Sequence, residues 1–351
     1  MAVQEIDQAR AEEFGGRLLG TVSGAMLALA VSVGHRTGLY DALAELDPAT
    51  SDEIAERTGL QERYIREWLA GQLAGGIVEY DAEAGTWWLP REKALSLTRA
   101  AGAHNLGILA SAVSRFGEVE DDVVRAFREG GGVSWQRLER IQEWQPELTS
   151  AVFDIEAVLG LVPGLVELLR EGIDVLDVGC GLGHASLRIA DAYPASRVLG
   201  VDQAAKSIAA AGAEAERLGL GDVRFEQRDA AELEPGSADL VLAFDVVHDL
   251  ARPYETLAAI RTALRSGGVF VMAEHALSSR PEQNVGHPLA AALYTVSLFH
   301  CMTASLSEHG EGIGLAWGEE RIRPALAEAG FAEVEVQGLE GDPLNAYYIG
   351  R

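Results

Sequence analysis

Residues 175–183 read VLDVGCGLG, an apolar strand pattern that runs directly into three glycines, Gly179, Gly181 and Gly183. A helix pattern begins near Ala185, so the glycines lie in the turn between a strand and a helix. Glycine lets the backbone approach a ligand closely, and the amides at a helix N-terminus favour electron-rich ligand atoms. The segment therefore predicts a binding loop for a nucleotide-like ligand.

Short apolar runs alternate with helical stretches on the C-terminal side of this loop, which predicts a parallel sheet with helices on both faces. Only nine residues join the last two runs, 334–336 and 346–349. A parallel crossover needs about a dozen or more, so we expect these two strands to form an antiparallel hairpin. The other predicted strands are 175–178, 198–201, 223–226, 240–244 and 269–273.

The N-terminal part reads as helices followed by a short hairpin, the order of a winged-helix domain. Residues 17–47 carry a long apolar helix pattern that we expect to be largely buried. Thr50 and Glu53 form a capping box for the next helix, and Gly59 is placed to end it. The further predicted elements are helices over 52–58 and 62–73 and hairpin strands over 77–80 and 86–89.

Length and composition describe a globular protein of more than one domain. The chain has 351 residues, of which 48% are hydrophobic and 23% charged. Domains commonly contain about 100–200 residues. We therefore expect a winged-helix domain at 1–100, a helical connector at 101–165 that contributes to a substrate pocket, and a catalytic domain at 166–351.

Charge and cysteine content limit the partners. The formal net charge of −26 disfavours nucleic acid and anionic lipid surfaces. The apolar stretches 25–33 and 288–301 are shorter than the roughly 18 residues of a membrane span, so we expect a cytoplasmic protein. The two cysteines, Cys180 and Cys301, support neither a disulfide framework nor a zinc cluster, and no metal is expected.

Three kinds of ligand compete for the glycine loop: a dinucleotide, a nucleoside triphosphate and another nucleotide-like ligand. A dinucleotide fingerprint would have glycine or alanine where His184 stands, which disfavours a dinucleotide. A triphosphate loop would have a lysine after the glycines, and its absence excludes a nucleoside triphosphate. Asp202 closes the second strand, nineteen residues after Gly183, where a carboxylate can bind both ribose hydroxyls. Asp229 follows the third strand at a distance suited to an adenine amine.

These motifs resemble the class I S-adenosylmethionine-dependent methyltransferases, which implies a Rossmann-like α/β fold with a seven-stranded sheet and S-adenosylmethionine as cofactor. The resemblance covers residues 166–351. It rests on VLDVGCGLG, VLGVD, the QRDA of residues 227–230, and the strand LVLAFD that ends at Asp245. It implies that Gly179, Gly181 and Gly183 shape the loop, Asp177 supports the methionyl amine, Asp202 binds ribose, Asp229 and Ala230 flank adenine, and Asp245 lies at the cofactor site.

The whole layout is similar to small-molecule O-methyltransferases of plant and actinobacterial type, in which a winged-helix domain serves dimerisation. Residues 36–93 contain twelve acidic and six basic side chains, a net charge of −6 that is wrong for a DNA duplex. We therefore expect a homodimer. A winged-helix DNA-binding regulator is the alternative from another class of protein.

His248 is the candidate catalytic residue, because it lies just past the fourth strand, at the sheet edge where ligands of open α/β folds bind. The pair His248-Asp249 is similar to the catalytic pair of plant-type O-methyltransferases, with Leu250 where a tryptophan usually follows. The alternative is that His248 packs near the adenosine or caps the next helix. Candidate substrate-pocket residues are Trp144, His275, Tyr294 and His300.

The sequence thus predicts methylation of a small, largely apolar metabolite, most simply on oxygen, by in-line displacement at the sulfonium methyl group. Methylation of nitrogen, or a relative that binds the cofactor and performs other chemistry, are the enzymatic alternatives. The acceptor itself is not encoded in any motif.

Overall fold

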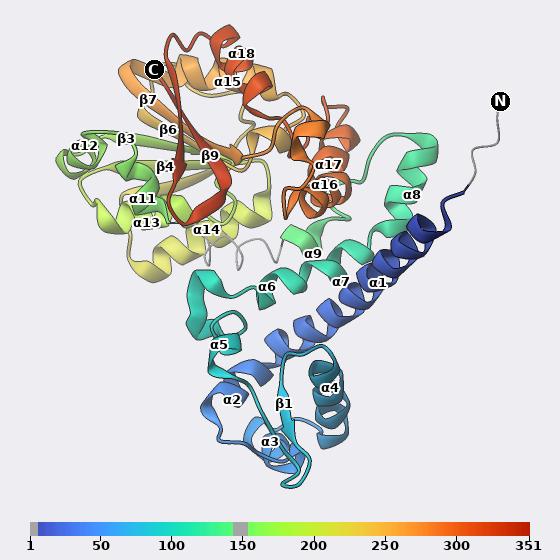
Figure 1. Cartoon of the computed structure of the whole chain (residues 1–351). Helices are drawn as coiled ribbons and strands as arrows, with labels where there is room; N and C mark the ends of the chain where they lie inside the picture. The colour runs from blue at the N-terminus through green and yellow to red at the C-terminus, as the bar shows by residue number, and fades with distance from the viewer. Residues whose placement is uncertain (1–5, 143–153) are drawn as a thin grey trace. The chain divides into compact units, whose positions relative to one another are not determined.

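The computed structural model describes residues 6–142 and 154–351. The chain divides into two compact units, Met1–Glu118 and Val119–Arg351, each with its own hydrophobic core. Residues 101–118 group with the N-terminal unit, and the sheet lies in the second unit (Figure 1).

The N-terminal unit has the predicted order of helices and hairpin. Thr50 and Glu53 form the expected reciprocal capping box, and Gly59 ends the helix with a φ of 71°. The hairpin is antiparallel, and each of its strands has three residues where four were predicted. The elements are α1 (Gln8–Thr37), α2 (Leu39–Glu45), α3 (Ser51–Thr58), α4 (Glu62–Ala74), β1 (Glu79–Asp81), β2 (Thr86–Trp88), α5 (Arg91–Ala94), the 3-10 helix η1 (Arg99–His104), α6 (Gly107–Ala110) and α7 (Ala112–Gly117).

Helix α1 corrects one expectation, because most of it is exposed rather than buried. Its side chains are solvent-exposed from Gln8 to Met26, and only the last turns pack on the unit. There, a Cβ on Gly34 would lie 2.5 Å from Trp68, so the close approach of α1 and α4 requires glycine. The apolar pattern was correctly recognised, but its packing partner is absent from the described residues of this chain.

The second unit is built on one seven-stranded sheet in the order β5-β4-β3-β6-β7-β9-β8. The first five strands in this order are parallel, and β9 pairs antiparallel with both β7 and β8, as the short connection predicted. The strands are β3 (Asp174–Val178), β4 (Arg197–Asp202), β5 (Val223–Gln227), β6 (Ala238–Phe244), β7 (Leu264–His275), β8 (Val334–Leu339) and β9 (Asp342–Gly350).

Helices cover both faces of this sheet. The helices that pack on it are α11 to α15 and α18. The helices of the second unit are α8 (Glu120–Glu129), α9 (Glu139–Gln142), α11 (Ile155–Gly160), α12 (Leu165–Glu171), α13 (His184–Ala192), α14 (Ala205–Leu218), the 3-10 helix η2 (Val247–Asp249), α15 (Pro253–Ala263), the 3-10 helix η3 (Pro281–Asn284), α16 (Ala290–Phe299), α17 (Cys301–Ser307) and α18 (Glu319–Glu328).

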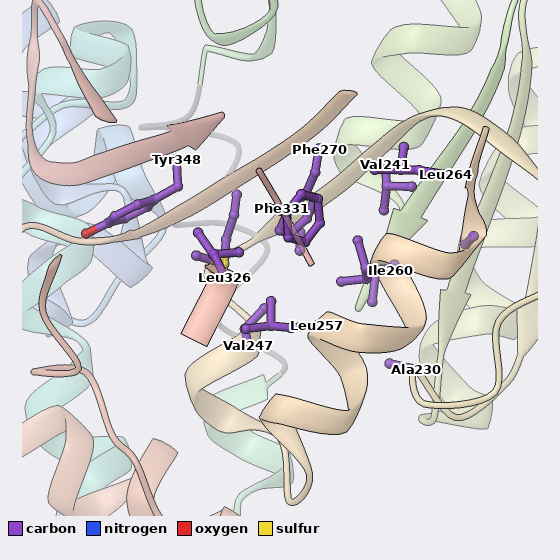
Figure 2. Packing of buried hydrophobic residues seen from close by; sticks show 14 of the residues in the cluster. Ala230, Val241, Val247, Leu257, Ile260, Leu264, Phe270, Leu326, Phe331 and Tyr348 are labelled. Atoms are coloured by element: carbon purple, nitrogen blue, oxygen red, sulfur yellow. The ribbon is translucent and has the colours of Figure 1, made fainter. Parts of the chain in front are cut away.

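The core follows the alternation of side chains along the strands. Val241 and Phe270 point to the face covered by α15 and α18, whereas their neighbours Leu240 and Val271 point to the face covered by α11 to α14. On the first face Phe270 stacks on Phe331 with ring centroids 5.3 Å apart (Figure 2). Both faces of the sheet are therefore buried, and the packed sheet is the framework for a site at its edge.

The order of strands places that site. From β3 the chain moves outward to β4 and β5 and then returns to β6 on the other side of β3. Ligands of open α/β sheets bind outside the carboxyl ends of the strands at such a switch point. The glycine loop follows β3 and Asp245 follows β6, so both lie at this position.

Candidate functional site at the carboxyl edge of the sheet

The three glycines of the loop all have positive φ but serve different purposes. A Cβ on Gly179 would lie 2.2 Å from Val246, and a Cβ on Gly183 would lie 2.6 Å from the ring of Phe225. Glycine is therefore required at both positions by the packing of the chain on itself. A Cβ on Gly181, whose φ is 53°, would meet no atom within 4 Å. The loop thus leaves open space at Gly181.

Asp202 faces this loop from the end of β4. One carboxylate oxygen accepts a hydrogen bond from the Gly181 amide at 2.9 Å, and the other accepts one from the Ala204 amide at 2.8 Å. Each carboxylate oxygen has two lone pairs, so both oxygens can still accept a hydrogen bond from a ligand. The backbone therefore fixes the carboxylate in an orientation suited to a pair of hydroxyl groups.

Asp177 lies below the loop on β3 and is almost fully buried. It accepts a hydrogen bond of 2.6 Å from the Ser186 hydroxyl on α13. Burial raises the pKa of this carboxyl to about 6, against the lowering effect of the Ser186 bond. The contact fastens the helix to the strand on either side of the glycine turn.

Asp229 lies in the turn after β5 and forms an ion pair with Arg252, a residue that the sequence did not single out. The two line a cavity of about 250 Å3 together with Gln203, Leu250, Ala251, Thr256 and Glu308. Ala230, the predicted neighbour of adenine, is buried in the core (Figure 2). A ligand amine that reached Asp229 would have to share this carboxylate with Arg252.

His248 lies in η2 and is 1% exposed. Its Nδ1 is 2.5 Å from an oxygen of Glu274 on β7, and its Nε2 is 3.1 Å from Oδ1 of Asp249. Burial would lower the pKa of His248, but the Glu274 and Asp249 carboxylates outweigh it and hold the pKa well above its usual range. In this arrangement the ring is an imidazolium between two carboxylates.

Further titratable side chains surround His248. Asp245, whose φ of 54° is unusual for a residue other than glycine, places Oδ1 3.3 Å from Nε2 of His275. The Nδ1 of His300 lies 3.9 Å from Oδ2 of Asp249 and 3.6 Å from the Cys301 sulfur. We call this group the His248 cluster; its members are Asp245, His248, Asp249, Glu274, His275, His300 and Cys301.

The cluster unites four sequence-predicted residues from three parts of the chain: Asp245 and His248, His275, and His300. Tyr294 is not a member of the cluster. Its hydroxyl accepts a hydrogen bond of 2.8 Å from the side-chain amide of Asn284. Trp144 falls outside the described residues. Sequence reasoning missed Glu274, although a lone carboxylate near the end of the apolar run VFVMAEH was a usable signal.

The residues of this edge suit a nucleoside with a cationic tail. Open space at Gly181, two oriented carboxylate oxygens on Asp202 and the carboxylate of Asp229 follow β3, β4 and β5 in that order along the edge. The edge is rich in carboxylates, which favours a positively charged group over a phosphate.

Two family models match the chain. The model of the Rv2258c-like winged HTH domain matches residues 25–99. A model described as a methyltransferase domain matches residues 169–330, which include the glycine loop, Asp202 and the His248 cluster.

Curated and solved proteins agree with these matches. The chain is 31% identical over 180 residues to a trans-aconitate 2-methyltransferase of Deinococcus radiodurans, a match that covers 50% of this chain and 61% of that enzyme. The chain therefore spans less than two thirds of that relative's length.

Two solved structures share the fold over nearly the whole chain. The first, a putative O-methyltransferase of Nostoc punctiforme, has a TM-score of 0.72 at 19% identity and covers 95% of this chain and 98% of its own. The second, human N-acetylserotonin methyltransferase in complex with SAM, has a TM-score of 0.70 at 17% identity and covers 100% and 99%. At these identities the likeness concerns the fold.

Proposed function

We propose that this chain, which belongs to the class I S-adenosylmethionine-dependent methyltransferases with an N-terminal winged-helix domain, methylates an oxygen atom of a small, largely apolar metabolite. The observation that supports this most strongly is the pairing of Gly181 with Asp202. It joins an open glycine turn to an oriented carboxylate at the switch point of the sheet.

We propose the cofactor-binding roles that the resemblance implies, and the positions of the side chains support them. Asp202 is proposed to bind the ribose hydroxyls, Asp229 and the backbone at Ala230 to bind adenine, and Gly179, Gly181 and Gly183 to shape the turn. Asp177 supports the methionyl end from beneath the loop. Asp245 extends the row of carboxylates toward the acceptor and attracts the sulfonium charge. When bound, S-adenosylmethionine supplies a methyl group on a sulfonium with a neutral thioether as leaving group.

On the acceptor side, His248 is proposed to take the proton. Glu274 holds Nδ1, so Nε2 is the nitrogen that exchanges a proton with the acceptor. Because the two carboxylates raise the pKa of His248, the ring acts as a base only in its less populated neutral form. The acceptor O–H bond breaks as its proton passes to Nε2, and the oxygen forms a bond to the methyl carbon. The cofactor would supply this methyl group, and its sulfur would leave as the thioether with the electron pair of the broken bond. His275 and His300 are proposed to border the acceptor.

The other parts of the proposal concern partners and location. We propose a homodimer formed through the exposed apolar face of α1, which includes Leu18, Leu19, Val22 and Met26. The net charge of −6 over residues 36–93 opposes DNA binding. The free thiols of Cys180 and Cys301 fit a reducing, cytoplasmic compartment.

Two measurements test the enzyme. Calorimetric titration with S-adenosylhomocysteine is expected to show one site per chain, and absence of binding would refute the proposal. Incubation of cell extracts with isotopically labelled cofactor is expected to give a small-molecule product heavier by one methyl group. If cofactor binds and no extract yields such a product, the chain is a cofactor-binding relative with other chemistry.

Two variants separate the roles of the edge residues. Asp202→Ala is expected to weaken cofactor binding at least about tenfold, because two charge-assisted hydrogen bonds are lost. His248→Ala is expected to lower kcat about 100-fold or more while cofactor affinity stays within about twofold of the parent. Equal cofactor affinity in Asp202→Ala and the parent would contradict the ribose assignment, and unchanged kcat in His248→Ala would contradict the base.

A further inference from the structure

We propose that His248, Asp249 and Cys301 form a binding site for one divalent metal ion of the zinc type, and that the bound metal stops methyl transfer. The ligand atoms of these three buried residues, a ring nitrogen, a carboxylate oxygen and a sulfur, lie within 4.8 Å of one another. They come from η2 and from the first residue of α17, which contact each other in the same unit. The inhibitory effect rests on the proposed function, whereas the binding site does not.

The spacing of the atoms is close to that of a zinc site. Bonds of 2.0–2.3 Å in a tetrahedron place the ligand atoms about 3.3–3.8 Å apart. His248 Nε2 and Asp249 Oδ1 are 3.1 Å apart. His300 Nδ1 lies 3.6 Å from the Cys301 sulfur and 3.9 Å from Asp249 Oδ2, so His300 is placed to supply the fourth ligand. To close around one ion, the first three ligand atoms, which lie within 4.8 Å of one another, have to move closer together.

An unpaired buried atom points to a missing partner. Within the described residues, Asp249 Oδ1 has no aligned hydrogen-bond donor, although Nε2 of His248 is only 3.1 Å away. The two atoms therefore lie side by side, as ligands do around a common centre. A divalent cation between the two atoms would replace the proton of His248 as the positive charge that Asp249 faces.

Glu274 supports the same interpretation. Its carboxylate holds Nδ1 of His248 and leaves Nε2 to face Asp249. Histidine ligands of metals usually donate their other ring N–H to such a carboxylate, which fixes the ring and raises its basicity. The orientation that a metal site needs is thus present.

The charges select the type of metal. Asp249 and the thiolate of Cys301 together neutralise a divalent ion. A thiolate with imidazole favours zinc-type metals over magnesium and calcium, which prefer oxygen ligands. Binding removes the proton from Cys301 and from Nε2 of His248. The metal then occupies the Nε2 lone pair that takes the acceptor proton. His248 therefore cannot act as a base in the metal-loaded protein.

Cobalt titration of the full-length protein, freed of metal by dialysis against a chelator, tests the site. We expect one equivalent of Co2+ to bind, with a sulfur-to-cobalt charge-transfer band and the visible bands of tetrahedral cobalt, and Zn2+ to displace it. Mg2+ is expected to have no effect. The absence of a sulfur-to-cobalt band at saturating Co2+ would overturn the proposal.

The two cysteines provide a matched control. Cys301→Ser is expected to abolish the band and weaken Co2+ binding at least about tenfold, whereas Cys180→Ser keeps both. Asp249→Asn is expected to weaken binding as well. Thermal unfolding of the metal-free variants checks that each is folded. A band that survives Cys301→Ser or disappears in Cys180→Ser would refute the assignment.

Activity gives an independent readout. One equivalent of Zn2+ is expected to reduce methyl transfer by at least about tenfold, chelator to restore it, and cofactor affinity to change by less than about twofold. Full turnover in the zinc-loaded protein would contradict the inhibitory role. Cofactor titration of the metal-free protein tests the proposed function separately, so the two failures can be told apart.

Discussion

Asp177 shows how one buried carboxyl links the glycine turn to stability. Its pKa is 3.8 when unperturbed and about 6 in the folded chain, because burial disfavours the charged form. The folded state therefore binds the proton more tightly than the unfolded state. The stabilisation is full below pH 3.8 and is lost as the pH rises through 6, by about 3 kcal/mol in total at 1.36 kcal/mol per pKa unit.

The variant Asp177→Asn isolates this effect, because it removes the charge and keeps an oxygen that can accept the Ser186 hydrogen bond. We expect the variant to gain stability relative to the parent as the pH rises from 4 to 7, since only the parent must bury a charge at neutral pH. Urea unfolding of both proteins at pH 4, 5.5 and 7 measures the difference. A difference in unfolding free energy that does not change with pH would contradict the prediction.

The glycine turn between β3 and α13 is the element on which the proposed cofactor binding depends, and its glycines should differ in effect. Gly183→Ala places a Cβ 2.6 Å from Phe225, in addition to the strain of a φ of 76°, so we expect a loss of stability of several kcal/mol. Gly181→Ala carries only the strain, about 1–2 kcal/mol, but its methyl group fills the open space.

We therefore expect Gly181→Ala to remain folded and to bind S-adenosylhomocysteine at least about tenfold more weakly than the parent. Thermal unfolding and calorimetry on the two variants measure both effects. Parent-like affinity in Gly181→Ala would show that the ligand does not occupy this space. Equal stability of the two variants would contradict the packing role of Gly183.

The elements themselves were predictable where their signals are local. The capping box at Thr50 and Glu53, the apolar runs of the five parallel strands, and the short connection to β9 each lie within a few residues of sequence. The contacts of the site are not local. Glu274 and His248 are 26 residues apart and meet because β6 and β7 are neighbours, and Arg252 meets Asp229 across 23 residues. No sequence spacing encodes these pairs before the strand order is known.

At the scale of the whole molecule, the exposed apolar face of α1 indicates that a partner covers it. Residues 18–33 contain no charged side chain, and Leu19 and Met26 are 71% and 63% exposed. By length and composition alone α1 could cross a membrane, as could residues Ala290–Ser307. We propose that a second copy of the chain covers this face. Contiguous exposed apolar faces mark interfaces, and pairing of α1 with its copy would bury these side chains.

The double variant Leu19→Glu, Val22→Glu tests this assembly. Two charges on the shared face should disfavour burial against the partner, so we expect sedimentation equilibrium to show a dimer for the parent and a dissociation constant raised at least about 100-fold for the variant. Leu168→Glu, at an exposed leucine of α12, is the matched control and should remain dimeric. A monomeric parent, or one that floats with phosphatidylcholine vesicles, would refute the proposed partner of α1.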